Sequence, residues 1–588
     1  MAESTTSAPP SSAAIPPLKT LTLAQIAQGL ETGAFTVVQL VQAHLDQIVR
    51  FNGVLRAVLQ VNPNALAIAQ ALDDELAVPG NKRLRPLHGV PLLVKDNIVT
   101  SEPALEATAG SLALLGAKPA RENSAVTRLR EAGCVLLGTT NCSEWANFRS
   151  RPSDSGWSAR GGQTYGAYHE RQDPFGSSSG SGVAVDMGFC VLALGSETSG
   201  SIISPAMQNN VVGLKPTTGL VSRDAVIPIS PVQDTLGPMT RTLVDAATML
   251  TFMAGRDEHD PKTAEIPMNL MSDYGAAATS GTKTPLNIRI GIPRNALKGI
   301  KSATLKTFES RVVAPLRELP GVTIVDCSFP GIMRFKGLGR EETTNYMAGE
   351  FHDALPAYLA TLTSNPQNID GFEALCTFLK TTPEEEYGED EENEKEKGGD
   401  EKAEKKEGVG KDDDESSDDD VRGDKTDKVK IDESPRRNIV RLEQTHRITK
   451  DSPAFEAAQI NTAYFAGPGG IQGALDGLRG GKERPHGFNT HEPVDALLLP
   501  STASAANYFA ACGGHPQVTI PLGYRDSRKV KFNDTGRLVA SGPNVPYGVS
   551  IIGRKYGETT ILPLCAAVEA LTKARAEAEY RRLEHLRG

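Results

Sequence analysis

The sequence predicts an α/β fold in which helices cover both faces of one large sheet. Helical patterns alternate with short apolar runs between residues 22 and 255, and further strand patterns follow nearer the C-terminal end. Alternation of this kind is typical of a sheet that is buried between helices. The chain has 588 residues, of which 39% are hydrophobic, and this is enough for a large core.

The first elements are identified by the residues at their ends. Thr22 precedes an apolar helical pattern and is the expected N-cap. An apolar run over residues 89–95 predicts a buried strand that ends at Lys95. Residues 124–133 predict an amphipathic helix that ends at a glycine, and a strand over 134–138 follows it directly.

The later elements follow the same alternation. Thr242 and Asp245 have the spacing of an N-terminal capping box, and the apolar pattern after them runs to Met253. A last helix is expected from residue 561, apolar at first and charged after Lys573. Further strands are expected at residues 288–292, 496–499, 517–520 and 547–552.

Two stretches do not fit a packed domain. Residues 1–18 are rich in Ser, Pro and Ala, which predicts a disordered tail. Residues 384–435 form an acidic, low-complexity insertion in which almost nothing is expected to be buried. The insertion is interpreted as a surface segment without a catalytic role. One alternative is a docking segment for a basic partner. Another is a segment that is itself phosphorylated, because Ser416 and Ser417 lie among acids.

Composition narrows the class of protein. The net charge of −10 argues against nucleic-acid binding through a general basic field. None of the seven cysteines forms a C-x-x-C pair, so we expect buried free thiols in a reducing compartment and no structural zinc. A secretory signal and an apolar run of about 18 residues are lacking, which predicts a cytoplasmic protein without a membrane span.

Residues 175–182, with the sequence FGSSSGSG, form the first candidate motif. Runs of Gly and Ser are usually linkers, but this one leads directly into an apolar run that must be buried. A phosphate-binding loop is the other alternative, although neither G-x-x-x-x-G-K-[ST] nor G-x-G-x-x-G is present. The position of the run favours a backbone-lined site.

The second motif, GSETSGSIISPA at residues 195–206, again places a serine among small residues after an apolar run. A hydroxyl nucleophile needs such surroundings, because glycine lets backbone N–H groups approach an incoming carbonyl. The amides of Thr198, Ser199, Gly200 and Ser201 could stabilise a tetrahedral oxyanion. An ordinary structural turn at Ser201 is the alternative.

The third motif, PLHGVPLLVKDN at residues 86–97, supplies a base. Lysine is almost never fully buried without a partner or a function, and Lys95 ends an apolar run. Desolvation would lower its pKa and allow it to act as a base near neutral pH. A surface lysine at the end of a strand is the alternative.

The three motifs together resemble the amidase signature family, a group of serine amidases with a Ser-Ser-Lys triad. The likeness runs from about residue 22 to 575 without the acidic insertion. Supporting matches lie at residues 137–144, 213–219, 234–241 and 514–523. The resemblance implies one α/β domain, made of residues 19–383 and 436–588, around a mixed, largely parallel twisted sheet.

The family's catalytic residues fall on three positions of this chain. The lysine of the G-V-P-x-x-V-K-D element falls on Lys95, the relay serine on Ser177, and the nucleophile of the G-S-I element on Ser201. The resemblance also implies a cis peptide beside the relay serine. Amide hydrolysis through a Ser201 acyl-enzyme, without a metal or an organic cofactor, is therefore the expected activity.

Several positions depart from the family pattern. Phe175 and Ser179 replace glycines, Ile203 replaces an arginine, and Ser199 stands where Gly or Asp is common. These changes spare the triad, and they concern the shape of the loop and of the substrate pocket.

Other interpretations of the sequence are weaker. His88 and His515 are expected to be structural, and Cys190 lies in an apolar run that does not favour a reactive thiolate. The amide-generating component of a tRNA-dependent amidotransferase and an inactive scaffold that works through the acidic insertion are the two rival functions. The expected partner is a small-molecule or peptide amide; peptide, fatty and aryl amides stay open as substrates, as does the oligomeric state.

Overall fold

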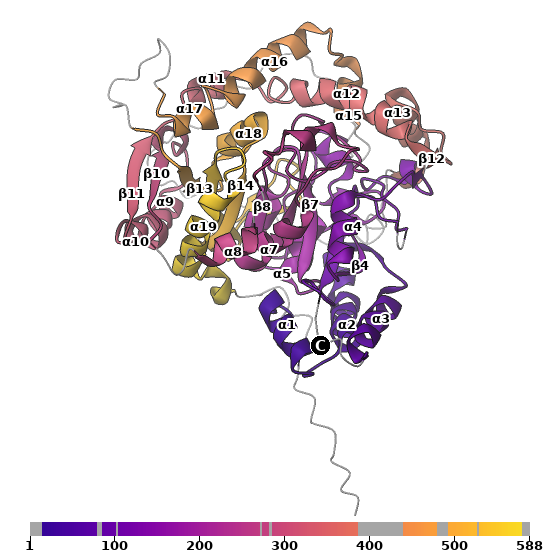
Figure 1. Ribbon diagram of the computed structural model, residues 1–588. Coiled ribbons are helices and arrows are strands. Elements are labelled where there is room, and N and C mark those ends of the chain that lie inside the picture. Colours follow the sequence, from indigo (N-terminus) through magenta and orange to yellow (C-terminus); the bar gives the residue numbers. More distant parts are fainter. Residues whose placement is uncertain are drawn as a thin grey trace, which may run out of the picture.

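Strands that are far apart in the chain meet in one mixed sheet, which crosses the centre of the computed structural model (Figure 1). The structure describes residues 15–78, 85–101, 104–270, 273–280, 285–385, 439–478, 492–525 and 529–578. The eleven strands are, in spatial order, β1 (Val58–Val61), β4 (Val135–Thr140), β2 (Pro91–Lys95), β7 (Leu192–Glu197), β9 (Thr235–Thr240), β8 (Val212–Lys215), β14 (Gln517–Tyr524), β17 (Pro546–Gly553), β13 (Ala496–Pro500), β10 (Ile288–Pro293) and β11 (Val322–Cys327).

Pairing within the sheet is parallel in two blocks. β2 pairs in parallel with β4 and with β7, and β10 pairs in parallel with β11 and with β13. The strands between these blocks and the edge strand β1 pair antiparallel. The predicted α/β fold with a mixed central sheet is confirmed, as are the predicted strands, with small shifts at their ends.

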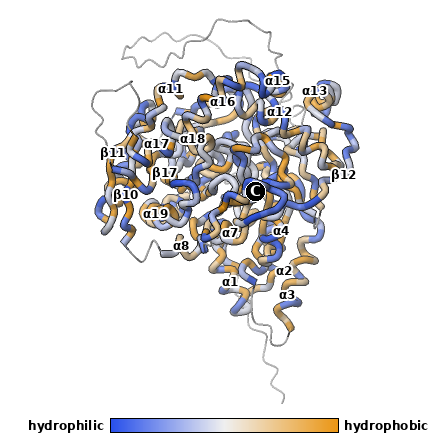
Figure 2. The backbone as a smooth tube through the Cα atoms, turned by 45° about the horizontal axis from the view of Figure 1, so that its top comes forward, coloured by the Kyte–Doolittle hydropathy of each residue, from blue (hydrophilic) through white to orange (hydrophobic). Residues whose placement is uncertain are grey.

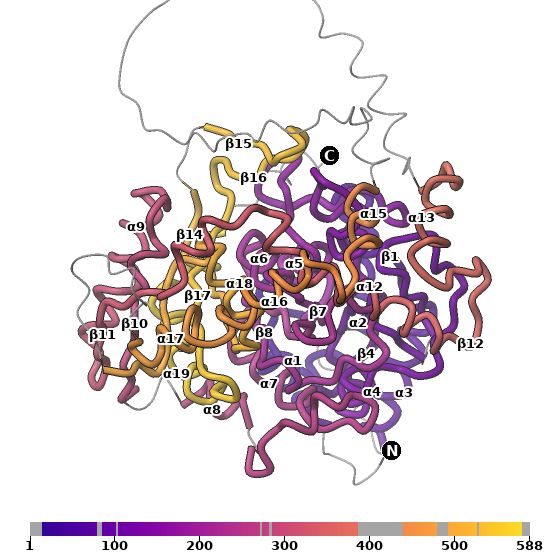
Figure 3. Tube along the Cα trace, turned by 90° about the horizontal axis from the view of Figure 1, so that it is seen from above, coloured from indigo at the N-terminus to yellow at the C-terminus, as the bar shows by residue number. Residues whose placement is uncertain are grey.

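Helices cover both faces of the sheet, as predicted. α4, α7, α8 and α19 contact one another in one group, while α5 and α6 contact each other beside β7 and β8 (Figure 3). The helices are α1 (Leu23–Glu31), α2 (Val37–Leu55), α3 (Ala65–Ala77), α4 (Ser124–Glu131), α5 (Ser179–Asp186), α6 (Ile203–Gln208), α7 (Leu243–Met253), α8 (Tyr274–Ser280), α9 (Ser302–Phe308), α10 (Ala314–Arg317), α11 (Ile332–Gly337), α12 (Asn345–Leu359), α13 (Phe372–Thr381), α15 (Val440–Arg447), α16 (Pro453–Ala466), α17 (Ile471–Leu475), α18 (Ser504–Gly513) and α19 (Glu558–Thr572).

Local sequence explains where the helices begin. Thr22 and Gln25 form a reciprocal capping box at α1, and the Thr242 side chain accepts from Asp245 N at the start of α7. The alternation of apolar and polar residues along α2 can be followed in Figure 2, and its apolar side is buried in the core. In the described part of the chain, no helix combines the length and the hydropathy that a membrane crossing requires.

A second, smaller core adjoins the main one. It joins α12, α13 and α15 to loop residues that include Trp145, Phe148 and Ile229. Small two-stranded sheets complete the fold: β3 (Lys118–Pro119) with β12 (Leu362–Ser364), β5 (Trp157–Ser158) with β6 (Gly162–Gln163), and β15 (Lys531–Phe532) with β16 (Val539–Ser541).

The predicted tail and most of the acidic segment fall outside the described residues. Residues 1–14 and 386–438 belong to this part. Glu385 lies at the start of the acidic segment and is fully buried, so the expectation that almost nothing there is buried is wrong at this position. The physical reason is an internal ion pair that the sequence does not reveal.

Candidate active site

The site begins where two neighbouring strands end. β2 and β7 run parallel, with Leu93 opposite Ala193, so their carboxyl ends emerge at the same edge of the sheet. Lys95 is the last residue of β2, and Ser196 is the last but one of β7. The side chain of Lys95 therefore crosses towards the neighbouring strand, and the residue is only 1% exposed.

Lys95 is held by three hydrogen bonds. Its Nζ donates to Ser177 Oγ at 2.7 Å, to Ser196 Oγ at 2.9 Å and to the Ser196 carbonyl at 3.3 Å. Ser196 Oγ in turn donates to Asn97 Oδ1 at 3.2 Å. These contacts fix the amine against one hydroxyl of the glycine- and serine-rich loop.

Burial changes the chemistry of this lysine. Desolvation disfavours the ammonium form and lowers the pKa of Lys95 from its usual 10.5 to about 8, while Cys142, Asp234 and Glu197 act in the opposite direction. A lysine with this pKa is partly neutral near pH 7. It can therefore accept a proton from a hydroxyl that touches it.

Ser177 lies in the loop that leads into α5. The Gly176–Ser177 peptide bond is cis, as the family resemblance predicts. The next residue ties this loop to the second motif, because Ser178 N donates to the Ser201 carbonyl at 3.1 Å and Ser178 Oγ donates to the Ser196 carbonyl at 3.0 Å. Lys95 thus contacts Ser177 directly, and the backbone of Ser201 is bonded to the residue that follows Ser177.

The turn that carries Ser201 is organised by Glu197. The buried carboxylate of Glu197 accepts from Ile202 N at 2.7 Å and from Ile203 N at 3.0 Å. Gly200 adopts a φ of +87°, which favours glycine. Within the ranges that the structure describes, the N–H groups of Ser199, Gly200 and Ser201 have no hydrogen-bond acceptor, so they are available to an incoming oxyanion.

Asp234 is a site residue whose role the sequence did not reveal. Thr198 Oγ1 donates to Asp234 Oδ1 at 2.5 Å, and Asp234 Oδ2 accepts from Ile229 N and Ser230 N. Burial raises the pKa of this carboxyl, and the hydrogen bonds to it oppose the change. In the sequence, Asp234 could have been noticed only because it lies within residues 234–241, one of the supporting matches to the family.

The loop at residues 145–147 has unusual backbone geometry and forms one wall of the cavity beside Ser177. Trp145, Ala146 and Asn147 all have positive φ, between 48° and 69°. Ser143 N donates to the Ser177 carbonyl at 3.1 Å, so this loop is bonded to the loop that carries Ser177. Ala146 lines a small cavity together with Ser177, Ser196, Thr198 and Asp234.

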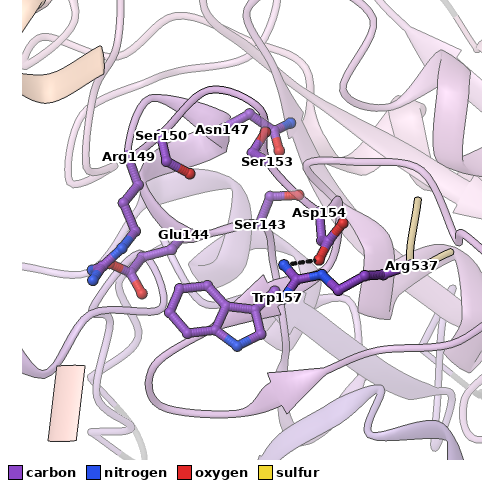
Figure 4. A pocket seen from close by; sticks show the side chains of 9 residues that line it. All are labelled: Ser143, Glu144, Asn147, Arg149, Ser150, Ser153, Asp154, Trp157 and Arg537. Carbon is purple, nitrogen blue, oxygen red and sulfur yellow. Dashed lines mark hydrogen bonds and ion pairs between the residues drawn. The ribbon is translucent and has the colours of Figure 1, made fainter. Parts of the chain in front are cut away.

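Buried charges hold this wall in place. Arg149 pairs with Glu144 and lies 3.1 Å from Glu385 Oε2, and all three side chains are at most 3% exposed. The Arg149 guanidinium lies 5.2 Å from the centre of the Trp157 ring, and Figure 4 shows both side chains together with Glu144. Burial and the nearby Glu385 raise the pKa of Glu144, and the Arg149 guanidinium opposes that change.

Both borders of the 386–438 segment contact this same loop. On one side, Glu385 accepts from Ser111 Oγ and from Leu112 N as well as from Arg149. On the other, Arg441 donates to the Asn147 carbonyl at 2.6 Å and lies 3.8 Å from the centre of the Phe148 ring. Sequence reasoning missed these contacts because they join residues more than 230 positions apart.

The departures from the family pattern are accommodated locally. Phe175 adopts a left-handed φ of 54°, a conformation that glycine takes more easily. Ser179 Oγ donates to the Phe175 carbonyl at 2.6 Å, which stabilises this turn. Ile203 is fully buried, and its N–H is one of the two that Glu197 binds.

The other candidates for chemistry have structural contacts. His88 and His515 are buried and contact the carbonyls of Leu72 and Gly553. Burial lowers the pKa of His515 to about 3 and raises that of Cys190 to about 12. All seven cysteines are buried and free, as predicted. In the described ranges, no three His, Cys, Asp or Glu side chains cluster as metal ligands would.

Comparison with known proteins decides the family. The amidase family model matches residues 39–368. An amidase-family protein of Arthroderma benhamiae is 35% identical over 96% of this chain and 88% of its own length. The chain belongs to the amidase signature family. The family consists of hydrolases that cleave C–N bonds, and membership confirms the resemblance drawn from the three motifs.

Other relatives of this amidase-family chain differ in coverage. The native peptide amidase of Stenotrophomonas maltophilia superposes with a TM-score of 0.72 at 31% identity, over 95% of this chain and 98% of that one. A glutamyl-tRNA(Gln) amidotransferase component of Chloroflexus aurantiacus is 37% identical over 53% of this chain and 60% of its own length. An amidase-family protein of Schizosaccharomyces pombe matches over 47% of each chain.

Proposed function

We propose that this protein is an amidase that hydrolyses linear carboxamides to a carboxylate and ammonia or an amine, with Ser201 as nucleophile. Lys95 is the base and Ser177 relays the proton between them. The observation that carries the proposal is the 2.7 Å contact between Lys95 Nζ and Ser177 Oγ in a fully buried setting. A buried lysine with a lowered pKa beside a hydroxyl is suited to proton abstraction.

The reaction begins with two proton transfers. Neutral Lys95 takes the proton of Ser177 Oγ as Ser177 Oγ takes that of Ser201 Oγ. Ser201 Oγ then forms a bond to the amide carbon, and the carbonyl π electrons move to oxygen. The N–H groups of Ser199, Gly200 and Ser201 stabilise that oxyanion, together with the N–H of Thr198.

Collapse of the tetrahedral intermediate breaks the C–N bond. The proton held by Lys95 returns through Ser177 to the leaving nitrogen, which departs as ammonia or an amine. Water then attacks the acyl-enzyme by the same relay, and Ser201 is released with the carboxylate product. Thr198 and Asp234 keep the oxyanion turn in position through their 2.5 Å hydrogen bond.

A panel of amides tests the activity. Peptide C-terminal amides, fatty primary amides and aryl amides are each incubated with wild-type protein and with Ser201→Ala, and released ammonia or amine is measured. Release by the wild type alone is expected for at least one class. Equal release by both proteins would overturn the assignment of Ser201, and the thermal unfolding midpoint of the variant checks that it is folded.

A second candidate is the amide-generating component of a tRNA-dependent amidotransferase, which the match to the Chloroflexus aurantiacus protein favours. The peptide amidase match extends over almost the whole of both chains and favours an amidase over an amidotransferase component. Glutamine is the discriminating substrate. Glutaminase activity that arises only after addition of a second protein would support the amidotransferase role.

A further inference from the structure

A second cavity lies beside the catalytic turn and has no place in the mechanism above. Phe175, two residues before Ser177, and Ser204, three residues after Ser201, both line it. Asn507 also lines it, and its amide nitrogen lies 3.3 Å from the position that a Cβ at Gly200 would take. The cavity therefore adjoins the proposed nucleophile.

Two cations and several neutral donors line this cavity, and among the residues that the structure describes no acidic side chain does. Lys301 and Arg525 are its charged residues. Hydroxyl or amide groups are contributed by Ser204, Thr304, Ser501, Thr502, Ser504 and Asn507. Such a set of donors with a positive charge is suited to a carboxylate or another small anion.

Among the described residues, the charges that act on Lys301 and Arg525 include no carboxylate. Burial lowers the pKa of Lys301, and the charges of Arg525 and Lys531 lower it further. Burial likewise lowers the pKa of Arg525, whose guanidinium lies 5.7 Å from the centre of the Tyr547 ring. Arg525 Nε is buried and, within the described part of the chain, has no hydrogen-bond partner. Cations that face one another in this way favour an anion between them.

We propose that Lys301 and Arg525 form a recognition site for an anionic group of the substrate, so that the enzyme prefers amides that carry a carboxylate. This inference rests on the proposed amidase function and specifies its substrate class. The amide carbon would lie at Ser201 while the carboxylate of the same molecule lies in the cationic cavity. Arg525 supplies a planar set of donors that matches carboxylate geometry, and Lys301 adds a mobile charge.

Matched pairs of primary amides test the preference. Succinamate, glutaramate and adipamate are compared with butanamide, pentanamide and hexanamide, which have the same number of carbons and no charge. The wild type is expected to show a higher kcat/KM for at least one anionic member than for its neutral partner. Arg525→Gln is expected to reduce that ratio about ten- to a hundredfold, since a charge-assisted hydrogen bond is lost.

Control variants separate the local charge from general effects. Lys298→Met removes an exposed cation from the same loop as Lys301, outside the cavity lining, and should leave the ratio unchanged. Arg525→Lys keeps the charge and should retain part of the preference. Neutral amides serve as an internal control, because a folding defect in Arg525→Gln would lower turnover of both members of a pair.

Each outcome bears on one of the two proposals. Turnover of neutral and anionic amides with equal kcat/KM would overturn the anion site and leave the amidase function intact. Absence of turnover with every amide would count against the amidase function, and the anion site is then judged by calorimetric binding of glutarate to Ser201→Ala. Equal glutarate affinity with and without the additional Arg525→Gln substitution would overturn the anion site.

Discussion

The activity of this protein is expected to rise steeply with pH, because Lys95 must lose its proton before it can act as a base. Burial lowers the pKa of Lys95 to about 8. The ammonium form predominates below this pH and cannot accept the proton of Ser177. The neutral form predominates above it, so kcat/KM follows the neutral fraction on the acidic side of the profile.

The size of the effect follows from this pKa. The neutral fraction of Lys95 is about 1% at pH 6, about 10% at pH 7 and about 90% at pH 9. The value of kcat/KM should therefore increase about tenfold from pH 6 to 7 and about tenfold again from pH 7 to 9. Lys95→Arg should abolish this pH dependence, because a guanidinium stays protonated throughout the range. Loss of the base should lower the rate by a factor of about 10²–10⁴.

The assay measures ammonia release from a neutral primary amide between pH 6 and 10 at constant ionic strength. A neutral substrate is chosen so that its own charge does not change, and far-UV circular dichroism at each pH verifies the fold. A profile that is flat from pH 6 to 9, or one with its midpoint near 6.5 as for an unperturbed histidine, would refute Lys95 as the base.

Three substitutions test the surroundings of the site. Thr198→Val removes the hydroxyl that binds Asp234 and keeps the backbone amide, so kcat should fall about ten- to a hundredfold. Thr198→Ser should restore the rate, and full activity of Thr198→Val would contradict the role of this hydrogen bond. Arg149→Met leaves two buried carboxylates unpaired and should cost about 3–5 kcal/mol of unfolding free energy by chemical denaturation, whereas Arg340→Met, in an exposed ion pair, should change it little. Gly180→Ala would place a Cβ 2.3 Å from the Ala57 carbonyl oxygen and should lower the free energy of unfolding by about 1–3 kcal/mol. An unchanged denaturation midpoint would show that the backbone at Ala57 can shift to accept the methyl group.

Local signals in the sequence marked Lys95 and the run that contains Ser177 as candidates, and the family resemblance paired the two residues. Lys95 is a charged residue at the end of an apolar run, and Ser177 lies in a glycine- and serine-rich run that precedes a buried helix. Each pattern by itself indicates burial or backbone-lined surroundings. The structure places these two side chains 2.7 Å apart, and the roles of the residues remain proposals.

Contacts that depend on strand order could not be predicted in the same way. Ser196 meets Lys95 only because β7 pairs with β2, although the two strands are almost 100 residues apart in the chain. Glu385 was assigned to a solvated acidic segment by composition, yet an internal arginine makes its burial favourable. The composition of a whole segment describes its average polarity, so it does not reveal that one residue at its border is buried in an ion pair.

Covalent labelling provides the most direct test of the nucleophile. The protein is treated with a reactive phosphonate, and intact mass and peptide mapping then locate the adduct. We expect one adduct per chain on Ser201, no labelling of Ser201→Ala, and slow labelling of Lys95→Arg because its base cannot be neutral. An adduct on Ser177 in the wild type, or equal labelling of wild type and Ser201→Ala, would contradict a Ser201 nucleophile activated by Lys95.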